Sequence, residues 1–164
     1  MKIISNKNAS ILLMLFTFLG CKELLEQDTP IYFDNQSNKI IQLYIPLVGM
    51  DGVVYPDTTL KIQKMNIGYN TLPGQRAYAG ISNISIEKWI SSFSKDTVSI
   101  FIFSKDTLDK YPWENIQQDY KILQRYDFSA EDIKSLYNKD DIPVIPYPPT
   151  EAMRCMKMYP PFGK

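Results

Sequence analysis

The sequence predicts an α+β fold, with a largely antiparallel sheet and short helices packed on it. Three observations support this class. Segments rich in β-branched and aromatic residues come first. Segments with helical spacing of apolar residues then follow among further strand-like segments, and there is no regular alternation of strand and helix. The alternative that the same pattern allows is a β-sandwich with helical insertions.

Strand and turn patterns dominate the first half of the folded region. Residues 31–35 and 39–48 have strand composition and flank a short polar turn. The dipeptide Asp51-Gly52, between apolar runs, predicts a two-residue hairpin. A turn at Pro73-Gly74 precedes an expected strand at 75–80.

Apolar spacing changes to a helical period after residue 85. Ile86, Trp89, Ile90 and Phe93 recur at i, i+3, i+4 and i+7, and Ser85 is placed to cap the helix. This spacing predicts that Trp89 belongs to the core.

The second half predicts three further extended segments. Residues 98–104 are apolar on both faces, which is typical of a strand covered on both sides. Residues 120–128 predict another inner strand, and the prolines of 142–149 confine that segment to an edge or a wrapping position.

Short helices are expected between these strands. Pro112 precedes a helical turn at 113–118, and Ser129 with Asp132 predicts a capping box that opens a helix to about residue 137. The pentapeptide FSKDT occurs at 93–97 and 103–107, without similarity in its flanks. We interpret both copies as polar turns, the second of which starts a short helix.

Residues 147–161, YPPTEAMRCMKMYPP, place three methionines and Cys155 between two Tyr-Pro-Pro brackets. A helix over 150–159 spreads the sulfurs around its axis, so it disfavours a soft-metal site. The same helix aligns Ala152, Cys155, Met156 and Tyr159 in a core-facing stripe. We therefore expect a packed helix with Cys155 buried.

The N-terminal residues predict export and lipidation. Residues 1–20 have a basic start and a short apolar run, which is typical of a signal peptide. Phe18-Leu19-Gly20-Cys21 resembles the lipobox of bacterial lipoproteins, although Phe18 replaces the usual Leu. The expected organisation is a signal at 1–20, a lipidated tether at 21–30 and one domain at 31–164, with acyl chains such as palmitate on Cys21. The alternative is an ordinary secretion signal with an incidental cysteine.

Charge and residue types exclude several functions. The chain of 164 residues has 18 basic and 18 acidic residues, and two lysines but no acid lie in the signal, so the mature chain has 16 basic and 18 acidic residues. Without a basic cluster we expect no nucleic-acid partner. The absence of histidine removes the usual catalytic triads and His-ligated zinc.

The remaining candidates for a site are acids and aromatic rings. A glycosidase pair among Asp57, Glu87, Asp109, Glu114 and Asp140-Asp141 is conceivable, but no spacing selects two of them. The stretch 34–39 is rich in oxygen ligands, yet it lacks the glycine and the distal glutamate of a calcium loop. Tyr-Pro dipeptides at 55, 111, 147 and 159 mark segment ends, and their rings are also suited to stacking on sugars.

Residues 112–129 and 147–164, together with the lipobox, resemble a group of small lipoproteins from Bacteroidota that has no assigned activity. The resemblance implies an outer-membrane or surface location and supplies no site residues. We expect a membrane-anchored, non-catalytic domain that binds an unknown protein or glycan partner, without a cofactor or a metal. The alternative is a carboxylate-based glycan hydrolase.

Overall fold

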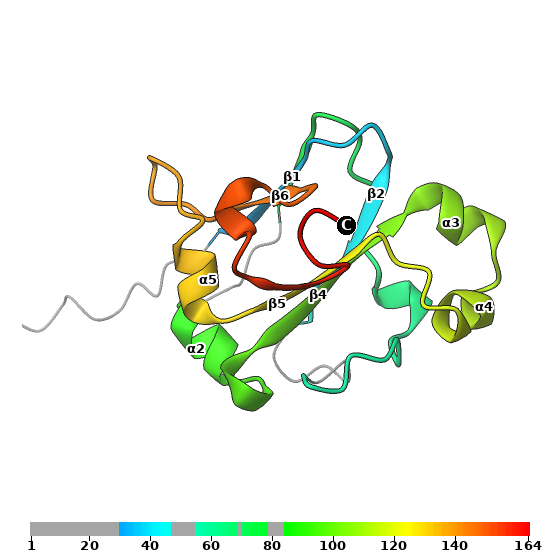
Figure 1. Cartoon of the computed structure of the whole chain (residues 1–164), viewed down its shortest axis with the longest axis horizontal. Helices are drawn as coiled ribbons and strands as arrows, with labels where there is room; N and C mark the ends of the chain where they lie inside the picture. The colour runs from blue at the N-terminus through cyan, green and yellow to red at the C-terminus, as the bar shows by residue number, and fades with distance from the viewer. Residues whose placement is uncertain (1–29, 47–54, 69, 79–83) are drawn as a thin grey trace, which may run out of the picture.

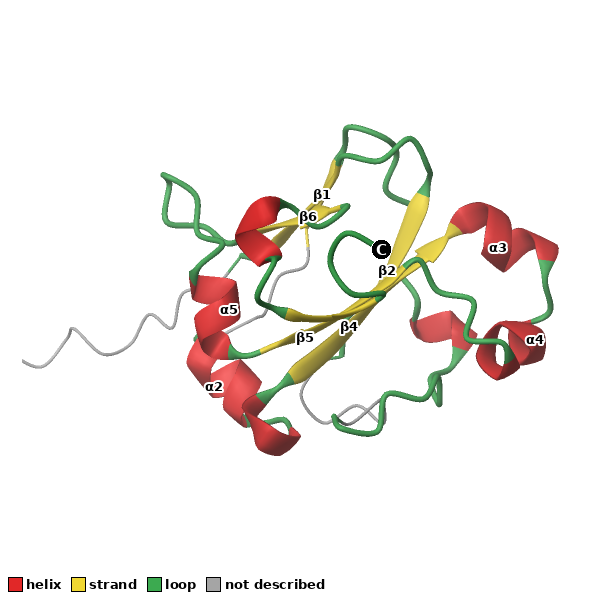
Figure 2. Ribbon diagram, viewed as in Figure 1, coloured by secondary structure: helices red, strands yellow, loops and turns green. Residues whose placement is uncertain are grey.

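The computed structural model describes residues 30–46, 55–68, 70–78 and 84–164. In this part of the chain, short helices intersperse with strands, which confirms the α+β class (Figure 1, Figure 2). The strands form two sheets rather than one, with the orders β3-β1-β6 and β2-β4-β5-β7. Residues of both sheets share one hydrophobic core, among them Phe33 and Ile145 from the smaller sheet and Ile100 from the larger.

The smaller sheet is mixed. Its central strand, β1 (Tyr32–Asn35), pairs antiparallel with β3 (Arg76–Tyr78) and parallel with β6 (Val144–Tyr147). Strand β6 carries Pro146 and lies at the edge, as predicted, because a proline has no N–H to donate to a further strand.

The larger sheet is antiparallel throughout and contains β2 (Ile41–Tyr44), β4 (Val98–Ser104), β5 (Gln124–Phe128) and β7 (Lys157–Tyr159). Every residue of β4 is buried, which confirms a strand covered on both faces. Strand β5 lies between β4 and β7, so the inner position is also confirmed, although the strand begins four residues later than predicted.

Asn35 directs the chain from one sheet to the other. Its side chain is fully buried, and its amide Nδ2 donates to the carbonyl oxygens of Lys39 at 2.8 Å and Thr71 at 2.9 Å. Its Oδ1 accepts from the backbone N–H of Ser37 at 3.1 Å. These bonds hold the turn between β1 and β2 and tie it to Thr71, which itself bridges to Ile41 of β2. The two strands belong to different sheets and do not form a hairpin.

The inner face of the larger sheet packs against the smaller sheet and two helices, α2 (Ile86–Ser91) and α5 (Ala130–Lys134). Both predicted caps are present, because Ser85 accepts from the Lys88 N–H and Ser129 forms a capping box with Asp132. Trp89 is fully buried, which confirms its core position. On this face lie Ile41, Leu43, Val98, Ile100, Ile102, Tyr126 and Phe128.

The outer face of the larger sheet carries a second hydrophobic cluster. It is covered by residues 55–68, which include a short 3-10 turn at Lys64–Asn66, and by two helices, α3 (Lys105–Lys110) and α4 (Trp113–Gln118). Figure 1 shows α3 and α4 at one end of the sheet and α2 and α5 at the other. The first FSKDT copy includes a 3-10 turn at Ser94–Asp96, as predicted. The second starts α3, as predicted, but it is not a polar turn, because Phe103 and Ser104 are the buried end of β4.

The predicted helix over 150–159 is wrong. The chain makes one 3-10 turn, Glu151–Met153, and then pairs as β7 with β5. Cys155 is exposed, whereas Met153, which was outside the expected core stripe, is fully buried. The open edge of β5 supplies hydrogen-bond partners for three further residues, and this pairing outweighs local helix propensity.

Other predictions fall on residues that the structure does not describe. These are the signal and most of the tether, the Asp51-Gly52 hairpin, and the ends of the strands expected at 39–48 and 75–80. In the described part of the chain, none of the helices has the length and apolar character that a transmembrane helix requires.

Candidate functional site

The outer face of the larger sheet is hollowed where its helical cover ends. A cavity of about 480 Å³ lies over β5 and β7, between the segment that begins at Tyr55 and the C-terminal residues Pro161 and Phe162. We call it the cationic cleft. It is lined by Tyr55, Pro56, Thr58, Arg125, Asp127, Arg154, Met156, Lys157, Met158, Pro161 and Phe162.

The alternation of residues in β5 explains why this cleft is polar. Arg125 and Asp127 alternate with Tyr126 and Phe128, so the charged pair faces outward while the aromatic pair faces the core. Sequence reasoning identified an inner strand here but missed the pair. Its only signal is the period-two pattern QRYDF, in which two charges occupy the positions of one face.

Asp127 is the buried anchor of the site, with 4% of its surface exposed. Its Oδ1 accepts a hydrogen bond of 2.7 Å from the Ser99 hydroxyl, which lies directly opposite on β4. Its Oδ2 accepts from Arg125 Nε at 3.1 Å. The carboxylate is therefore paired and hydrogen-bonded, as a buried charge requires.

Arg125 extends the network toward two aromatic rings. Its Nη1 donates to the Tyr120 hydroxyl, which in turn donates to the Thr58 carbonyl at 2.9 Å. Its guanidinium carbon lies 6.0 Å from the centre of the Tyr120 ring and 5.6 Å from that of Tyr159. Burial raises the pKa of the Tyr120 hydroxyl, while Arg125 acts in the opposite direction. These contacts fix Arg125 in place.

Two further cations complete the cleft, and each lies over a ring. The Arg154 guanidinium is 5.0 Å from the centre of Phe162, and the Lys157 ammonium is 5.4 Å from that of Tyr55. Arg154 is also bidentate to Glu151. Among the described residues no acid forms a salt bridge with Lys157, so its charge is available to a ligand.

A second cavity, of about 310 Å³, adjoins the cleft. We call it the proline groove because its walls are mainly prolines and aromatic rings. Gln124 Nε2 donates to the Pro160 carbonyl at 2.9 Å and so holds the C-terminal segment on β5. Pro161 and Phe162 line both cavities. The other groove residues are Leu123, Gln124, Tyr147, Pro148, Pro149, Pro160, Gly163 and Lys164.

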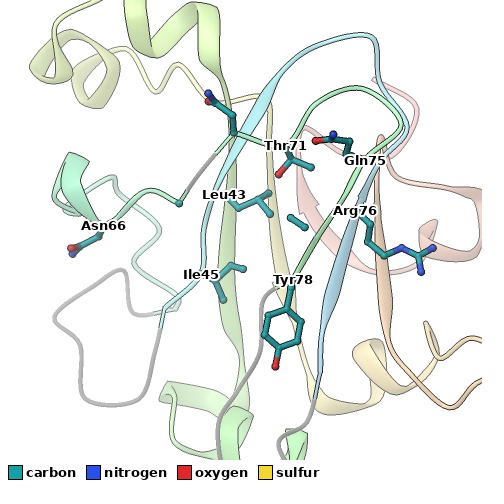
Figure 3. Close-up of a pocket in the computed structure, with 10 residues that line it drawn as sticks. Leu43, Ile45, Asn66, Thr71, Gln75, Arg76 and Tyr78 are labelled. Carbon is teal, nitrogen blue, oxygen red and sulfur yellow. The ribbon is translucent and has the colours of Figure 1, made fainter.

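A third cavity, of about 370 Å³, lies between β2 and β3 (Figure 3). Leu43 and Ile45 form an apolar wall, and Arg76 extends away from them. Ile45 and Tyr78 lie close in sequence to segments outside the described residues, as do Gly68 and Asn70. In the cationic cleft only Tyr55 and Pro56 lie beside such a segment, so more of its lining is described and we place the candidate site there.

The acids considered for hydrolysis lie on separate elements and line none of these three cavities. Glu87 is on α2 and pairs with Lys134, whereas Asp109 is on α3 and pairs with Lys105. Glu114 is on α4, and Asp140-Asp141 form the turn between α5 and β6.

Neither of the two perturbed acids among them has the pKa of a general acid. Hydrogen bonds from Lys61 and Thr59 lower the pKa of the Asp57 carboxyl to about 2. Hydrogen bonds from its own backbone N–H and from Lys134 lower the pKa of Glu87. A glycosidase acid needs its pKa raised.

The other predicted candidates contribute no ligand cluster. The Asn35 side chain in the 34–39 stretch is used for hydrogen bonds within the protein. In the described ranges no group of three or more His, Cys, Asp or Glu side chains could hold a metal ion. Cys21 lies outside those ranges.

Three of the four Tyr-Pro bonds are cis, at Tyr55, Tyr147 and Tyr159. Residues of these three dipeptides line the cleft or the groove, and Tyr159 contacts Arg125.

Comparison of the chain with known protein families, with curated proteins and with solved structures finds no match.

Proposed function

We propose that this protein is a lipid-anchored, non-catalytic binding domain of the outer membrane or cell surface, and that its cationic cleft binds an anionic ligand. The observation that carries the proposal is the arrangement of three cations over aromatic rings in one cavity. One of them, Lys157, forms no salt bridge with a described acid.

The anchor is supported by the sequence. The lipobox-like Phe18-Leu19-Gly20-Cys21 follows a short apolar run, and a thiol is the nucleophile that thioether lipidation requires. Two or more acyl chains hold a protein stably on a membrane. Residues 22–30 reach about 30 Å when extended, so the folded domain stays near the membrane surface.

The binding role is supported by how the cleft is built. A cation that lies over a ring keeps its full positive charge, so it can still attract an anion from its other side. Arg125 is fixed by hydrogen bonds to Asp127 and Tyr120, so little conformational entropy is lost when a ligand contacts it.

Binding is favoured over hydrolysis by the number of carboxylates in the cleft. A carboxylate-based glycosidase needs two acids about 5–10 Å apart across the substrate. Asp127 is the only acid among the residues that line the cleft, and both its oxygens accept hydrogen bonds from protein groups. The hydrolase alternative has no comparable support.

The anchor is tested by Cys21→Ser. We expect the variant to remain unprocessed or to leave the membrane fraction, because no lipid is attached. Cys155→Ser is the matched control and should fractionate like the wild type. If mature Cys21→Ser protein stays with the membranes, the anchor proposal is wrong.

The cleft is tested with three anionic probes: inorganic phosphate, galacturonate oligomers and a short polyglutamate peptide. We expect calorimetry at low ionic strength to detect at least one of them binding. Lys157→Glu should abolish that binding, while Lys139→Glu, an exposed residue in the turn before β6, should retain it. The binding proposal is wrong if no probe binds or if the two variants behave alike.

A further inference from the structure

Resting on the proposed function, we propose that the ligand is an acidic oligosaccharide. One sugar carboxylate lies in the cationic cleft beside Lys157, and the neighbouring ring lies in the proline groove on the other side of Phe162. Four features of the two cavities carry this inference: their net charge, the number of unpaired cations, the mixture of rings and polar groups, and the wall that they share.

The charge of the cleft matches a single carboxylate. Arg125, Arg154 and Lys157 are balanced in part by Asp127 and by Glu151, which pairs with Arg154. Three positive and two negative charges leave one net positive charge. A ligand with one negative charge at this point neutralises the cleft, whereas a dianion leaves an excess charge in a partly enclosed site.

The unpaired cation also fits a carboxylate better than a phosphate. Arg125 uses Nε and Nη1 for Asp127 and Tyr120, and Arg154 uses Nε and Nη2 for Glu151. Both arginines are thus paired with a carboxylate, and the Lys157 ammonium is the one cation on the cleft wall that no described acid compensates. A phosphate group has at least three acceptor oxygens, which protein sites satisfy with several converging donors. The same argument disfavours free phosphate and the phosphate of a lipid headgroup equally.

The lining of the two cavities suits a sugar ring, which is apolar on its faces and polar around its edge. Tyr55 and Phe162 are half-buried rings in the cleft, and Tyr147 is a half-buried ring in the groove. Thr58 and Gln124 place polar groups among these rings. Amphipathic rings beside polar groups are typical of binding surfaces that are apolar at one end and hydrated at the other.

The shared wall indicates a ligand longer than one sugar. Pro161 and Phe162 line both cavities, so the cleft and the groove lie on the two sides of one ring. The cavities, of about 480 and 310 Å³, lie within or near the size range of small-ligand pockets. Two linked rings can therefore occupy them together.

An acidic peptide fits this site less well. A peptide that binds beside a sheet adds a strand to a free edge and pairs with its backbone. The free edge here is β7, which has three residues and is followed by Pro160 and Pro161. Neither proline has an N–H to donate, so an added strand cannot continue along this edge.

The experiment compares trigalacturonate with galacturonate monomer and with fully methyl-esterified trigalacturonate, by calorimetry on the full mature chain. We expect the trimer to bind about tenfold or more tightly than the monomer, which corresponds to one additional ring contact. The ester should not bind, because it keeps the rings but has no charge. Lys157→Gln should lower the affinity for the trimer by about ten- to a hundredfold.

Phe162 separates the two subsites. Phe162→Ala should remove the advantage of the trimer and, because Phe162 also lines the cleft, should weaken monomer binding to a smaller extent. Phe162→Leu keeps the apolar volume if the alanine variant fails to fold. Tyr78→Ala, an exposed ring of the other sheet, is the matched control and should bind like the wild type.

Three results would overturn the inference. One is equal binding of the ester and the acid, and another is equal binding of monomer and trimer by the wild type. The third is binding of phosphate or polyglutamate that depends on Lys157 while trigalacturonate does not bind. That third result leaves the anion-binding role intact and assigns the cleft to a different ligand class, whereas failure of every probe removes the proposed function itself.

Discussion

The two faces of the four-stranded sheet differ in what covers them. The inner face is apolar along β2, β4 and most of β5, and the smaller sheet, α2 and α5 cover it. The outer face is apolar only where α3, α4 and residues 55–68 cover it. Toward β5 and β7 it becomes polar, with Ser99, Asp127 and Lys157 in register across three strands and Arg125 two residues from Asp127 on β5.

This difference separates stability from recognition. Burial of large apolar side chains on the inner face supplies the main driving force for folding. The polar end of the outer face contributes little burial, but it holds charged groups in fixed positions on rigid strands. Binding residues placed on a rigid scaffold in this way are already organised for their ligand.

Trp89→Ala tests the inner face and should have the largest effect. The side chain is fully buried in α2, so its removal should lower the free energy of unfolding by about 3–5 kcal/mol. Urea denaturation measures the change. Leu72→Ala, at a side chain that is 42% exposed, is the control and should change stability far less. An unchanged denaturation midpoint for Trp89→Ala would contradict a buried inner core.

Asp127→Ala tests the polar end of the outer face. The variant leaves Arg125 without its buried partner, and Ser99 loses an acceptor, so the free energy of unfolding should fall by about 2–3 kcal/mol. A double-mutant cycle with Arg125→Ala isolates the coupling between the two side chains. Additive effects in that cycle would show that the pair does not interact in solution.

Tyr126→Phe tests the link between the two sheets. The Tyr126 hydroxyl donates to the Pro146 carbonyl at 3.0 Å, and its loss should cost about 1 kcal/mol near neutral pH. Burial also raises the pKa of Tyr126 well above its usual range. Since the folded state holds the neutral phenol, the wild type should lose stability as the pH rises above the unfolded value of about 10.

The variant should lose less stability at alkaline pH, with a slope shallower by up to about 1.4 kcal/mol per pH unit. Urea denaturation at neutral and alkaline pH measures both effects. Tyr78→Phe, at a side chain that is 60% exposed, is the matched control. Parallel pH curves for the wild type and Tyr126→Phe would refute the contribution of this buried hydroxyl.

Cys155→Ala should have the smallest effect, within about 0.5 kcal/mol, because the side chain is exposed. In a Cys21→Ser background Cys155 is the only thiol, and a thiol reagent should label it in the native protein nearly as fast as after unfolding. Slow labelling of Cys155 in the native protein would show instead that the side chain is buried, as the sequence predicted.

Local sequence patterns predicted helices and strands correctly where interactions between residues close in sequence determine them. The cap at Ser85, the capping box at Ser129 and the buried strand at 98–104 are confirmed, because each depends on residues that are close in sequence. The segment 150–159 was predicted wrongly. Its apolar spacing fits a helix, but its partner β5 lies about thirty residues earlier, and local spacing carries no information about such a partner.

The cleft could not be predicted for the same reason. Ser99, Asp127 and Lys157 are neighbours only because β4, β5 and β7 pair in one register. Phe162 belongs to the site because β7 pairs with β5 and Gln124 bonds the Pro160 carbonyl. The sequence by itself determined the fold class and the buried Trp89, since hydrophobic period and caps are local properties. Tertiary structure alone decided the division into two sheets, the exposure of Cys155 and the assembly of the cations, because backbone pairing over long sequence separations is satisfied only when the whole chain is folded.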